Sequence, residues 1–512
     1  MRATLWEELR HSLALHAQRV ALQMGGVTVT YAQLDAWSSE VARQICSLGV
    51  ERGDPVALYL RNGLEFVVCD VAIARMGAVK VPINYMLPRE TIAYMVEQAA
   101  AKAVVFDATL ARANELNFEH QIRLVVGELE GFSANSEGLV DLPHVSGVAP
   151  FGDGAVDASA TAAVYFTGGT TGKPKGVVHT QASTVALHYA QMLEAEITDS
   201  ERLLLMTPLA HAAGLFTQSA LIRGATVVLT DGFDAKEMVE LLERETITWT
   251  FLVPTMIYRL LDQLAQASSS TSLRTVVYGA APISPERLRE ALEVLGPVFV
   301  QLYGQTECPN WGTKLAKEDH RLTNADLLAS CGKASIFADV KVVDDVGAEL
   351  TRGEIGEICL RSPYTMKEYL LDPKSTEEKF LGSFIRTGDV GVMDESGYVY
   401  LLDRKNDMII TGGMNVYCRE VEDVMSQHPH VRHVAVIGIP HADWGESVHA
   451  VVVCSGPIGD RELIAWSKAR LAAYAAPKSV EFVEVLPETP FGKIDKKALR
   501  APYWSGTSRS IG

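Results

Sequence analysis

Strand and helix patterns alternate between residues 234 and 303, and this alternation restricts the possible folds of the chain more than any other feature. Asp234 and Glu237 form a capping-box pattern before one helix, and Ser284 with Pro285 at the first helical position begins another. Three apolar runs predict strands: Ile247–Val253, Leu273–Tyr278 and Phe299–Tyr303. Strands that alternate with helices predict βαβ units and a largely parallel sheet, and therefore the α/β class.

Two short segments lie at the carboxyl ends of the second and third predicted strands, at Gly279–Pro282 and Tyr303–Glu307. The carboxyl ends of parallel strands share one edge of a sheet, and ligands bind at that edge in open α/β folds. We therefore expect the two segments to lie side by side at a binding site.

The residue types at this edge suit a purine nucleotide. Gly279 and Ala280 offer a backbone surface without bulk, and Tyr303 offers an aromatic face. Gln301 supplies an amide that can pair with the purine edge. Glu307 would repel phosphates unless a hard cation such as Mg²⁺ bridged the two. Each residue alone has a plain structural interpretation, but their adjacency favours a site.

A segment rich in glycine and threonine follows the apolar run Ala162–Phe166. Glycines let backbone N–H groups approach a polyphosphate, while hydroxyl and ammonium groups add donors and charge. These glycines and donors are Thr167, Gly168, Gly169, Thr170, Thr171, Gly172, Lys173 and Lys175. The spacing differs from the loop of nucleotide triphosphatases, because Gly168 and Gly172 are too close and Pro174 follows the lysine. A flexible surface turn is the alternative interpretation.

Composition excludes some partners and bounds the architecture. The 46 basic and 63 acidic residues give a net charge of −17, which disfavours nonspecific binding to nucleic acid or to anionic membranes. The length of 512 residues predicts two or more domains. Seven scattered cysteines without a Cys-x-x-Cys pair favour reduced thiols and a cytoplasmic location. Neither a signal peptide nor a membrane span is expected from the apolar pattern.

Six motifs, in order, resemble the motif series of the adenylate-forming superfamily, which includes acyl-CoA synthetases, firefly luciferase and the adenylation domains of peptide synthetases. They are Tyr165–Gly176, Tyr303–Glu307, Arg386–Asp389, Asp403–Arg404, Gly412–Gly413 with Asn415, and Pro490–Lys493. Within the superfamily, the chain is most similar to medium- and long-chain or aryl acyl-CoA synthetases. The resemblance extends from about Thr30 to Lys493.

The resemblance implies two domains with ATP bound between them. A large N-terminal domain, residues 1–402, would contain parallel and mixed sheets flanked by helices. A small, mobile α+β domain, residues 403–512, would carry the catalytic lysine. ATP, Mg²⁺ and coenzyme A are the implied cofactors and co-substrates.

The resemblance also implies individual roles. Asp389 and Arg404 would hold the ribose, Thr306 would contact the α-phosphate, and Glu307 would hold Mg²⁺. Lys493 would approach both the attacking carboxylate and the α-phosphate. Further nucleotide contacts would come from Gly279, Ala280, Ala281, Pro282, Gln301, Leu302, Tyr303 and Gly304. After adenylation the small domain would rotate and bring Gly412 and Gly413 to the thiol channel.

Three positions depart from the family pattern. Asn406 replaces the usual Asp or Lys at the hinge, and Gly168 replaces a common serine. Cys418 stands where many relatives have proline, in a loop that guides the thiol by resemblance. We interpret Cys418 as a small buried residue, although its position leaves the thiol step less certain than adenylation.

The acyl pocket is assigned by resemblance to His211, Ala212, Gly214, Gly279, Gly304 and Trp311. His211 would gate this pocket and count among the catalytic residues, although a packed core histidine fits the sequence equally well. Trp311 could project into the pocket and shorten it. No Asp near the pocket is identifiable as an amine-binding residue, so we expect a fatty or aromatic carboxylic acid.

The predicted activity is that of an ATP-dependent acid–thiol ligase, which forms an acyl adenylate and then an acyl-CoA. One alternative delivers the acyl group, or another activated acid such as nitrite, to a discrete carrier protein or other nucleophile. Many fatty acyl-AMP ligases have a linker insertion that is not evident around Ile336–Glu357. Its absence there favours CoA over a carrier protein as the acyl acceptor. A second alternative is an inactive ATP-binding regulator, but Lys493, Glu307 and Asp389 are all present. A homodimer is compatible with the sequence, although no segment marks an interface.

Overall fold

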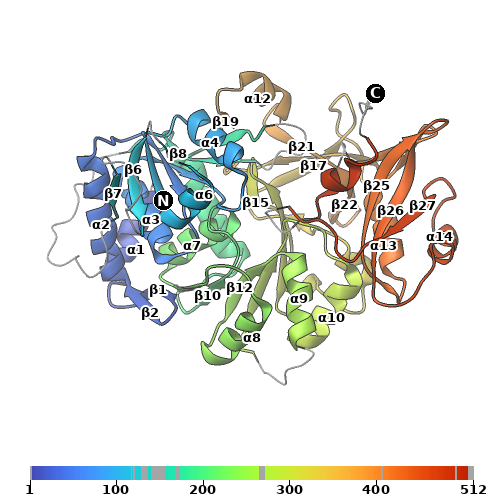
Figure 1. The fold of residues 1–512 in the computed structure, drawn as a ribbon, viewed down its shortest axis with the longest axis horizontal. Helices are drawn as coiled ribbons and strands as arrows, with labels where there is room; N and C mark the ends of the chain where they lie inside the picture. The colour runs from blue at the N-terminus through green and yellow to red at the C-terminus, as the bar shows by residue number, and fades with distance from the viewer. Residues whose placement is uncertain are drawn as a thin grey trace.

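The computed structural model describes residues 3–116, 118, 121–127, 136–139, 156–167, 173–264, 271–404, 407–489 and 493–504. Within these residues the strands form four sheets, and Figure 1 shows that helices cover and separate them. The last sheet lies in a separate orange-to-red region at one end of the molecule. The α/β class and the large N-terminal and small C-terminal parts are as predicted.

A nine-stranded sheet carries the predicted nucleotide edge. Its order is β16-β15-β14-β13-β12-β10-β11-β1-β2. The strands are β1 Val20–Met24, β2 Val27–Thr30, β10 Arg202–Leu205, β11 Thr226–Leu229, β12 Trp249–Leu252, β13 Thr275–Tyr278, β14 Phe299–Gln305, β15 Cys308–Leu315 and β16 Lys333–Ala334. Strands β12, β13 and β14 are parallel neighbours, which confirms the predicted βαβ units. Antiparallel β2, β15 and β16 make the sheet mixed.

An eight-stranded sheet carries the glycine-rich hairpin. Its order is β19-β9-β8-β4-β3-β5-β6-β7. The strands are β3 Pro55–Tyr59, β4 Val79–Pro82, β5 Ala103–Asp107, β6 Ile122–Val126, β7 Ser136–Gly138, β8 Thr161–Phe166, β9 Gly176–Thr180 and β19 Glu368–Tyr369. Strands β8 and β9 pair antiparallel, from Thr161 with Thr180 to Phe166 with Gly176, and the glycine-rich segment lies between them in the sequence.

Two smaller sheets follow in the chain. The first contains β17 Asp339–Val343, β18 Ile355–Arg361, β20 Phe380–Leu381, β21 Phe384–Met393 and β22 Val399–Arg404. The second contains β23 Ile409–Thr411, β24 Met414–Val416, β25 Val431–His441, β26 Gly445–Cys454 and β27 Ser479–Phe482. We call residues 407–504, which hold this second sheet and its helices, the C-terminal lobe.

Fifteen α-helices lie in the described part of the chain. They are α1 Leu5–Leu15, α2 Tyr31–Ser47, α3 Leu64–Met76, α4 Arg89–Gln98, α5 Ala108–Ala113, α6 Gln181–Glu194, α7 Ala212–Arg223, α8 Ala235–Arg244, α9 Pro254–Leu264, α10 Pro285–Leu295, α11 Ala325–Leu328, α12 Pro373–Lys379, α13 Cys418–Ser426, α14 Asp460–Lys468 and α15 Lys496–Arg500. The predicted caps are present: the Asp234 and Ser284 side chains accept the N–H groups of Glu237 and Arg287. None of these described helices is both long and apolar enough to cross a membrane.

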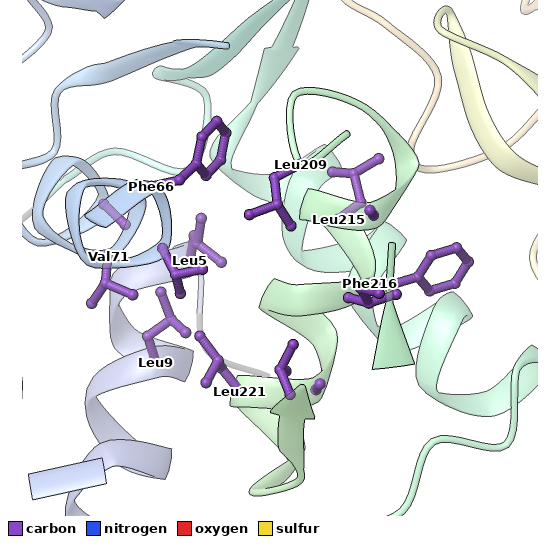
Figure 2. Close-up of a cluster of buried hydrophobic side chains, with 14 of the residues drawn as sticks. Leu5, Leu9, Phe66, Val71, Leu209, Leu215, Phe216 and Leu221 are labelled. Atoms are coloured by element: carbon purple, nitrogen blue, oxygen red, sulfur yellow. The ribbon is translucent and has the colours of Figure 1, made fainter. Parts of the chain in front are cut away.

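The largest core fills the space between the two large sheets. Almost every residue of α3 is buried, and α7 is buried along most of its length. Figure 2 shows side chains of α1, α3 and α7 gathered in this core, among them Leu5, Val71 and Leu221. This packing fixes the start of α7, where His211 is the N-cap residue.

Candidate active site

The carboxyl ends of β13 and β14 form one edge, as the sequence predicted. Tyr278 and Gln301 are register partners, and Gly279 follows Tyr278 directly. A Cβ at Gly279 would lie 2.5 Å from the Leu302 carbonyl oxygen, so only glycine allows this approach of the two strands. Ala280 next to it has a left-handed backbone, with φ of 66°, and is exposed. Ala281 and Pro282 complete the turn into α10.

Strand β14 extends further than predicted. Tyr303 and Gly304 lie within β14, which ends at Gln305, and the turn to antiparallel β15 occupies Thr306 and Glu307. Tyr303 is in the strand as predicted, but the expectation that Gly304 and Gln305 lie past its end is wrong, because pairing with β15 prolongs β14. A Cβ at Gly304 would meet the Cys308 carbonyl oxygen at 2.6 Å, which explains the glycine in this tight hairpin.

The glycine-rich hairpin is joined to this edge. His179 on β9 donates from Nε2 to the Thr306 carbonyl oxygen at 2.9 Å. Burial lowers the pKa of His179 to about 4, so the ring is neutral and can act as this donor. At the base of the hairpin, the Thr167 N–H donates to the Lys175 carbonyl at 3.0 Å. The predicted phosphate contacts Gly168, Gly169, Thr170, Thr171 and Gly172 lie outside the described residues.

Glu307 is a buried carboxylate with two strong partners. The Tyr369 hydroxyl donates to Glu307 Oε1, and Lys379 Nζ lies 3.3 Å from the same oxygen. Burial acts to raise the pKa of Glu307, but the Lys379 ammonium and the Tyr369 hydrogen bond outweigh it and leave the pKa below its usual value. The carboxylate is therefore ionised at neutral pH.

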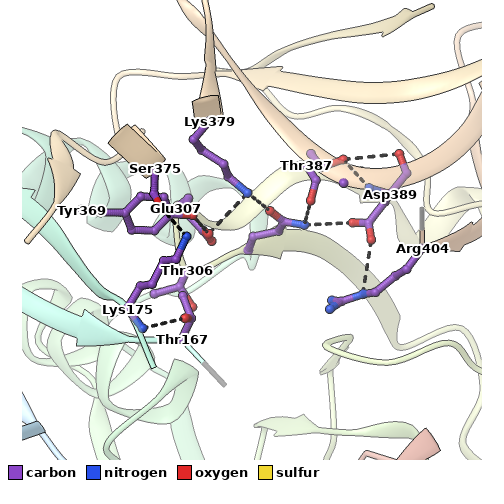
Figure 3. Close-up of polar contacts among 12 residues, drawn as sticks. Thr167, Lys175, Thr306, Glu307, Tyr369, Ser375, Lys379, Thr387, Asp389 and Arg404 are labelled. Atoms are coloured by element: carbon purple, nitrogen blue, oxygen red, sulfur yellow. Dashed lines mark hydrogen bonds and ion pairs between the residues drawn. The ribbon is translucent and has the colours of Figure 1, made fainter. Parts of the chain in front are cut away.

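Lys175 lies on the other side of Tyr369. Its ammonium is 5.0 Å from the centre of the Tyr369 ring and donates to Ser375 Oγ at 2.6 Å. Tyr369 thus contacts both Glu307, which pairs with Lys379, and the ammonium of Lys175, as Figure 3 shows. This arrangement of cations beside one ionised carboxylate suits a polyphosphate with a bound metal ion.

Asp389 organises the other half of the site. Its Oδ2 accepts hydrogen bonds from the Tyr303 hydroxyl at 2.7 Å and from Gln305 Nε2 at 3.0 Å. Its Oδ1 lies 3.4 Å from Arg404 Nε, and the two residues are register partners across β21 and β22. Gln305 also donates to the Thr387 carbonyl at 2.7 Å. The predicted ribose pair is therefore assembled around one buried carboxylate (Figure 3).

Lys493 of the C-terminal lobe reaches the same site. Its pKa is lowered to about 8, mainly by burial and then by the charge of Arg404, with Asp389 acting in the opposite direction. The charge of Lys493 in turn adds to burial in lowering the pKa of His211 to about 4. Lys493 is therefore near enough to His211, Arg404 and Asp389 for the charges to act on one another, so residues distant in sequence lie in one region of the protein.

Adenylation should depend on pH through Lys493. An ammonium with a pKa of about 8 is protonated below that pH and loses its charge above it. We expect kcat/KM for ATP to fall roughly tenfold per pH unit above about pH 8, whereas Lys493→Arg should move the fall to higher pH. Pyrophosphate release measured across this range checks the expectation. If kcat/KM of the arginine variant fell over the same pH range as that of the wild type, the expectation would be contradicted.

Of the predicted acyl-pocket residues, Ala212 and Gly214 lie on α7 after His211, and Trp311 lies on β15, whereas Gly279 and Gly304 belong to the edge of β13 and β14. A small pocket reaches His211 and is otherwise lined by Pro82, Leu87, Met95, Phe166, Thr167, Pro174 and Ala210. Ala212 begins α7, and a Cβ at Gly214 would lie 2.1 Å from the Leu209 carbonyl oxygen, so Gly214 is required by this turn. Trp311 is fully buried and packs edge-on against Phe216, with 6.5 Å between ring centres.

The thiol-channel residues lie in the C-terminal lobe. Gly412 and Gly413 form the turn between β23 and β24, with φ of 58° and 80°. Cys418 is fully buried at the start of α13, and its backbone N–H donates to Asp403 Oδ2 at 2.7 Å. The interpretation of Cys418 as a small buried residue is therefore confirmed. Asn406 lies outside the described residues.

Sequence reasoning missed several residues of this site. Gln305 and Thr387 stand within the quoted motifs but received no role. Tyr369 and Ser375 lie outside the quoted motifs. Lys379 was also missed, because the sequence Glu377-Glu378-Lys379 is typical of a solvated helix face.

The site fits Mg²⁺. Glu307 is an ionised carboxylate in the turn between β14 and β15, and ionised carboxylate oxygens are the hard ligands that Mg²⁺ takes. Within the described residues, no group of three or more His, Cys, Asp or Glu side chains could hold a metal. Mg²⁺ at nucleotide sites is commonly held by one or two carboxylates together with phosphates, and Glu307 meets that requirement.

Known proteins share this sequence pattern. Residues 9–370 match the family of AMP-binding enzymes, and residues 420–493 match the AMP-binding enzyme C-terminal domain. The medium/long-chain-fatty-acid–CoA ligase FadD8 of Mycobacterium tuberculosis is 35% identical over 98% of this chain and 90% of its own. The fatty acid–[acyl-carrier-protein] ligase ScoC of Streptomyces coeruleorubidus is 32% identical over 99% of this chain and 98% of its own.

A solved structure has the same fold. The amide bond synthetase McbA from Marinactinospora thermotolerans superposes with a TM-score of 0.88 at 32% identity, covering 98% of this chain and 100% of McbA. The three proteins are named for different products: the first is named a CoA ligase, the second an acyl-carrier-protein ligase and the third an amide bond synthetase.

Proposed function

Since this chain belongs to the adenylate-forming family of AMP-binding enzymes, which use ATP and Mg²⁺, we propose that it activates a fatty or aromatic carboxylic acid and transfers the acyl group to CoA. One observation carries the proposal: the ionised Glu307 beside Lys379 and the Asp389–Arg404 pair both lie against the end of β14, where Gln305 contacts Lys379 and Asp389. The similarity to a CoA ligase over nearly the whole chain supports the acceptor.

The chemistry explains why these groups are needed together. A carboxylate is a poor acyl donor, and ATP converts it into an acyl adenylate with AMP as the leaving group. Two anions must approach each other, and negative charge shifts to the departing pyrophosphate. The ammonium groups of Lys493 and Lys175 and the metal ion would offset that charge.

The binding residues divide along the nucleotide. Asp389 and Arg404 would hold the ribose, Thr306 would contact the α-phosphate, and Glu307 would hold Mg²⁺. Gly279, Ala280 and Tyr303 would enclose the adenine, and the hairpin after Thr167 would bind the outer phosphates. Neutral His211, beside an apolar pocket, would border the acid.

The second step requires a different arrangement. We place the domain boundary between residues 402 and 403, with the C-terminal domain at 403–512, and propose that this domain rotates between the two half-reactions. Rotation would remove Lys493 and bring the Gly412–Gly413 turn to the thiol. The separate matches of residues 9–370 and 420–493 support two units.

A carrier protein or an amine is the second candidate acceptor. The carrier-protein ligase ScoC and the amide bond synthetase McbA are nearly as similar to this chain as the CoA ligase. The acid pocket and the adenylation centre would be unchanged in that case, and only the nucleophile would differ.

Pyrophosphate release distinguishes these acceptors. We expect release with ATP and Mg²⁺ that depends on one acid from a panel of fatty acids, aromatic acids and nitrite. Addition of CoA should convert the product into an acyl-CoA, detected by mass. An adenylate that accumulates despite CoA would contradict the CoA assignment and favour a carrier protein or an amine.

A further inference from the structure

Lys379 is the cation that pairs with Glu307. Its Nζ lies 3.3 Å from Glu307 Oε1 and donates to Gln305 Oε1 at 3.1 Å. Both charged side chains are largely buried, with 15% and 9% of their surfaces exposed. We propose that Lys379 is the exchangeable counter-cation of Glu307, which pairs with it in the nucleotide-free protein and yields to Mg²⁺ when Mg·ATP binds. This inference rests on the metal role of Glu307 in the proposed function.

A buried carboxylate needs such a partner. Burial of a charged side chain is costly unless an opposite charge or a hydrogen-bond donor lies beside it. The Lys379 ammonium and the Tyr369 hydroxyl both contact Oε1 of Glu307 and orient the carboxylate.

Lys379 and a metal ion would compete for the charge of one carboxylate. Two cations beside the same carboxylate repel each other, so a metal ion on Glu307 would weaken or displace the Lys379 contact. A free Mg²⁺ ion brings no phosphate oxygens to accept the displaced ammonium, whereas Mg·ATP does. Lys379 therefore makes Glu307 a poor site for the free ion and ties metal entry to the nucleotide.

The local structure allows only the side chain to move. Helix α12 begins at Pro373 with Asp372 as its cap, and Thr376 Oγ1 accepts the Tyr369 N–H at 2.9 Å. The helix is thereby fixed to the strand that carries Tyr369. Lys379 is its last residue, and its flexible four-carbon stem can change partner while the backbone stays in place.

Binding of Mn²⁺ to the nucleotide-free protein, measured by electron paramagnetic resonance, tests the proposal. Lys379→Met should tighten Mn²⁺ binding by roughly tenfold, since it removes the competing charge-assisted contact. Lys379→Arg keeps a cation and should bind Mn²⁺ as weakly as the wild type. Lys374→Met on the exposed face of α12, where Lys374 pairs only loosely with Glu378 at 3.9 Å, should leave binding unchanged.

Two results would overturn the proposal. One is a Lys379→Met protein that binds Mn²⁺ no more tightly than the wild type while thermal unfolding shows it folded; Lys379→Gln replaces it if it does not fold. The other is a Mn²⁺ affinity above that of the wild type that persists in the double variant Glu307→Gln/Lys379→Met, because the ion would then bind somewhere other than Glu307. Mn²⁺ binding requires neither acid nor CoA, so either result is independent of the test of ligase activity.

Discussion

Lys493→Ala should lower the rate of adenylate formation by about 10²- to 10³-fold, the usual cost of removing one preorganised electrostatic group. The lysine is the cation that the C-terminal lobe contributes beside His211, Arg404 and Asp389. It has no part in the attack of the thiol, because that step is proposed to occur after the lysine has left. Thiolysis of a supplied acyl adenylate should therefore proceed at the wild-type rate.

ATP–pyrophosphate exchange and single-turnover thiolysis measure these two rates separately. Lys497→Ala is the matched control, since Lys497 is exposed on the following helix α15. That variant should leave both rates unchanged. Equal losses of adenylation and thiolysis in Lys493→Ala would show that the lysine supports the fold or both steps, against the proposed alternation.

Asp389→Asn should lower kcat/KM for ATP by about 10²-fold and destabilise the protein by about 1–3 kcal/mol. The Asp389 carboxylate accepts bonds from Tyr303 and Gln305 on one oxygen and faces Arg404 with the other. An amide NH₂ at either position would face donors instead of accepting from them. Buried donors would lose their acceptor, and the ribose would lose a charged partner.

Asp394→Asn separates the two effects of that substitution. Asp394 accepts the Tyr398 N–H at 2.8 Å in the turn between β21 and β22, away from the nucleotide residues. Its replacement should reduce the melting temperature slightly and leave KM for ATP unchanged. The ribose role of Asp389 would be refuted if both variants raised KM for ATP equally.

Local signals account for the part of the fold that was predicted. Ser284 and Pro285 begin α10 as expected, because caps and first-turn prolines act within a few residues. The parallel order of β12, β13 and β14 followed from short apolar runs separated by helices. The extension of β14 beyond Tyr303 was missed, because it depends on pairing with β15.

The site was predicted only where motifs fall on its residues. Asp389, Arg404 and Glu307 were found through their motif positions, and the structure brings Asp389 and Arg404 into contact. Glu307 lies in the turn between β14 and β15, and Lys379 is the last residue of α12. No spacing rule predicts that these two residues form a pair. Trp311 was expected beside the acyl pocket from its position after Thr306, whereas its packing against Phe216 depends on how α7 and β15 meet.

The contacts between the C-terminal lobe and the rest of the protein have an energetic consequence. Arg432 pairs with Asp262 at 2.8 Å and Arg259 with Glu488 at 3.2 Å, and all four side chains are substantially exposed. Exposed pairs of this kind contribute at most about 1 kcal/mol each and weaken as salt is added. A closed arrangement resting on such contacts is separated from open ones by a small free-energy difference. Bound nucleotide and acid, more than the lobe interface, then determine which population dominates.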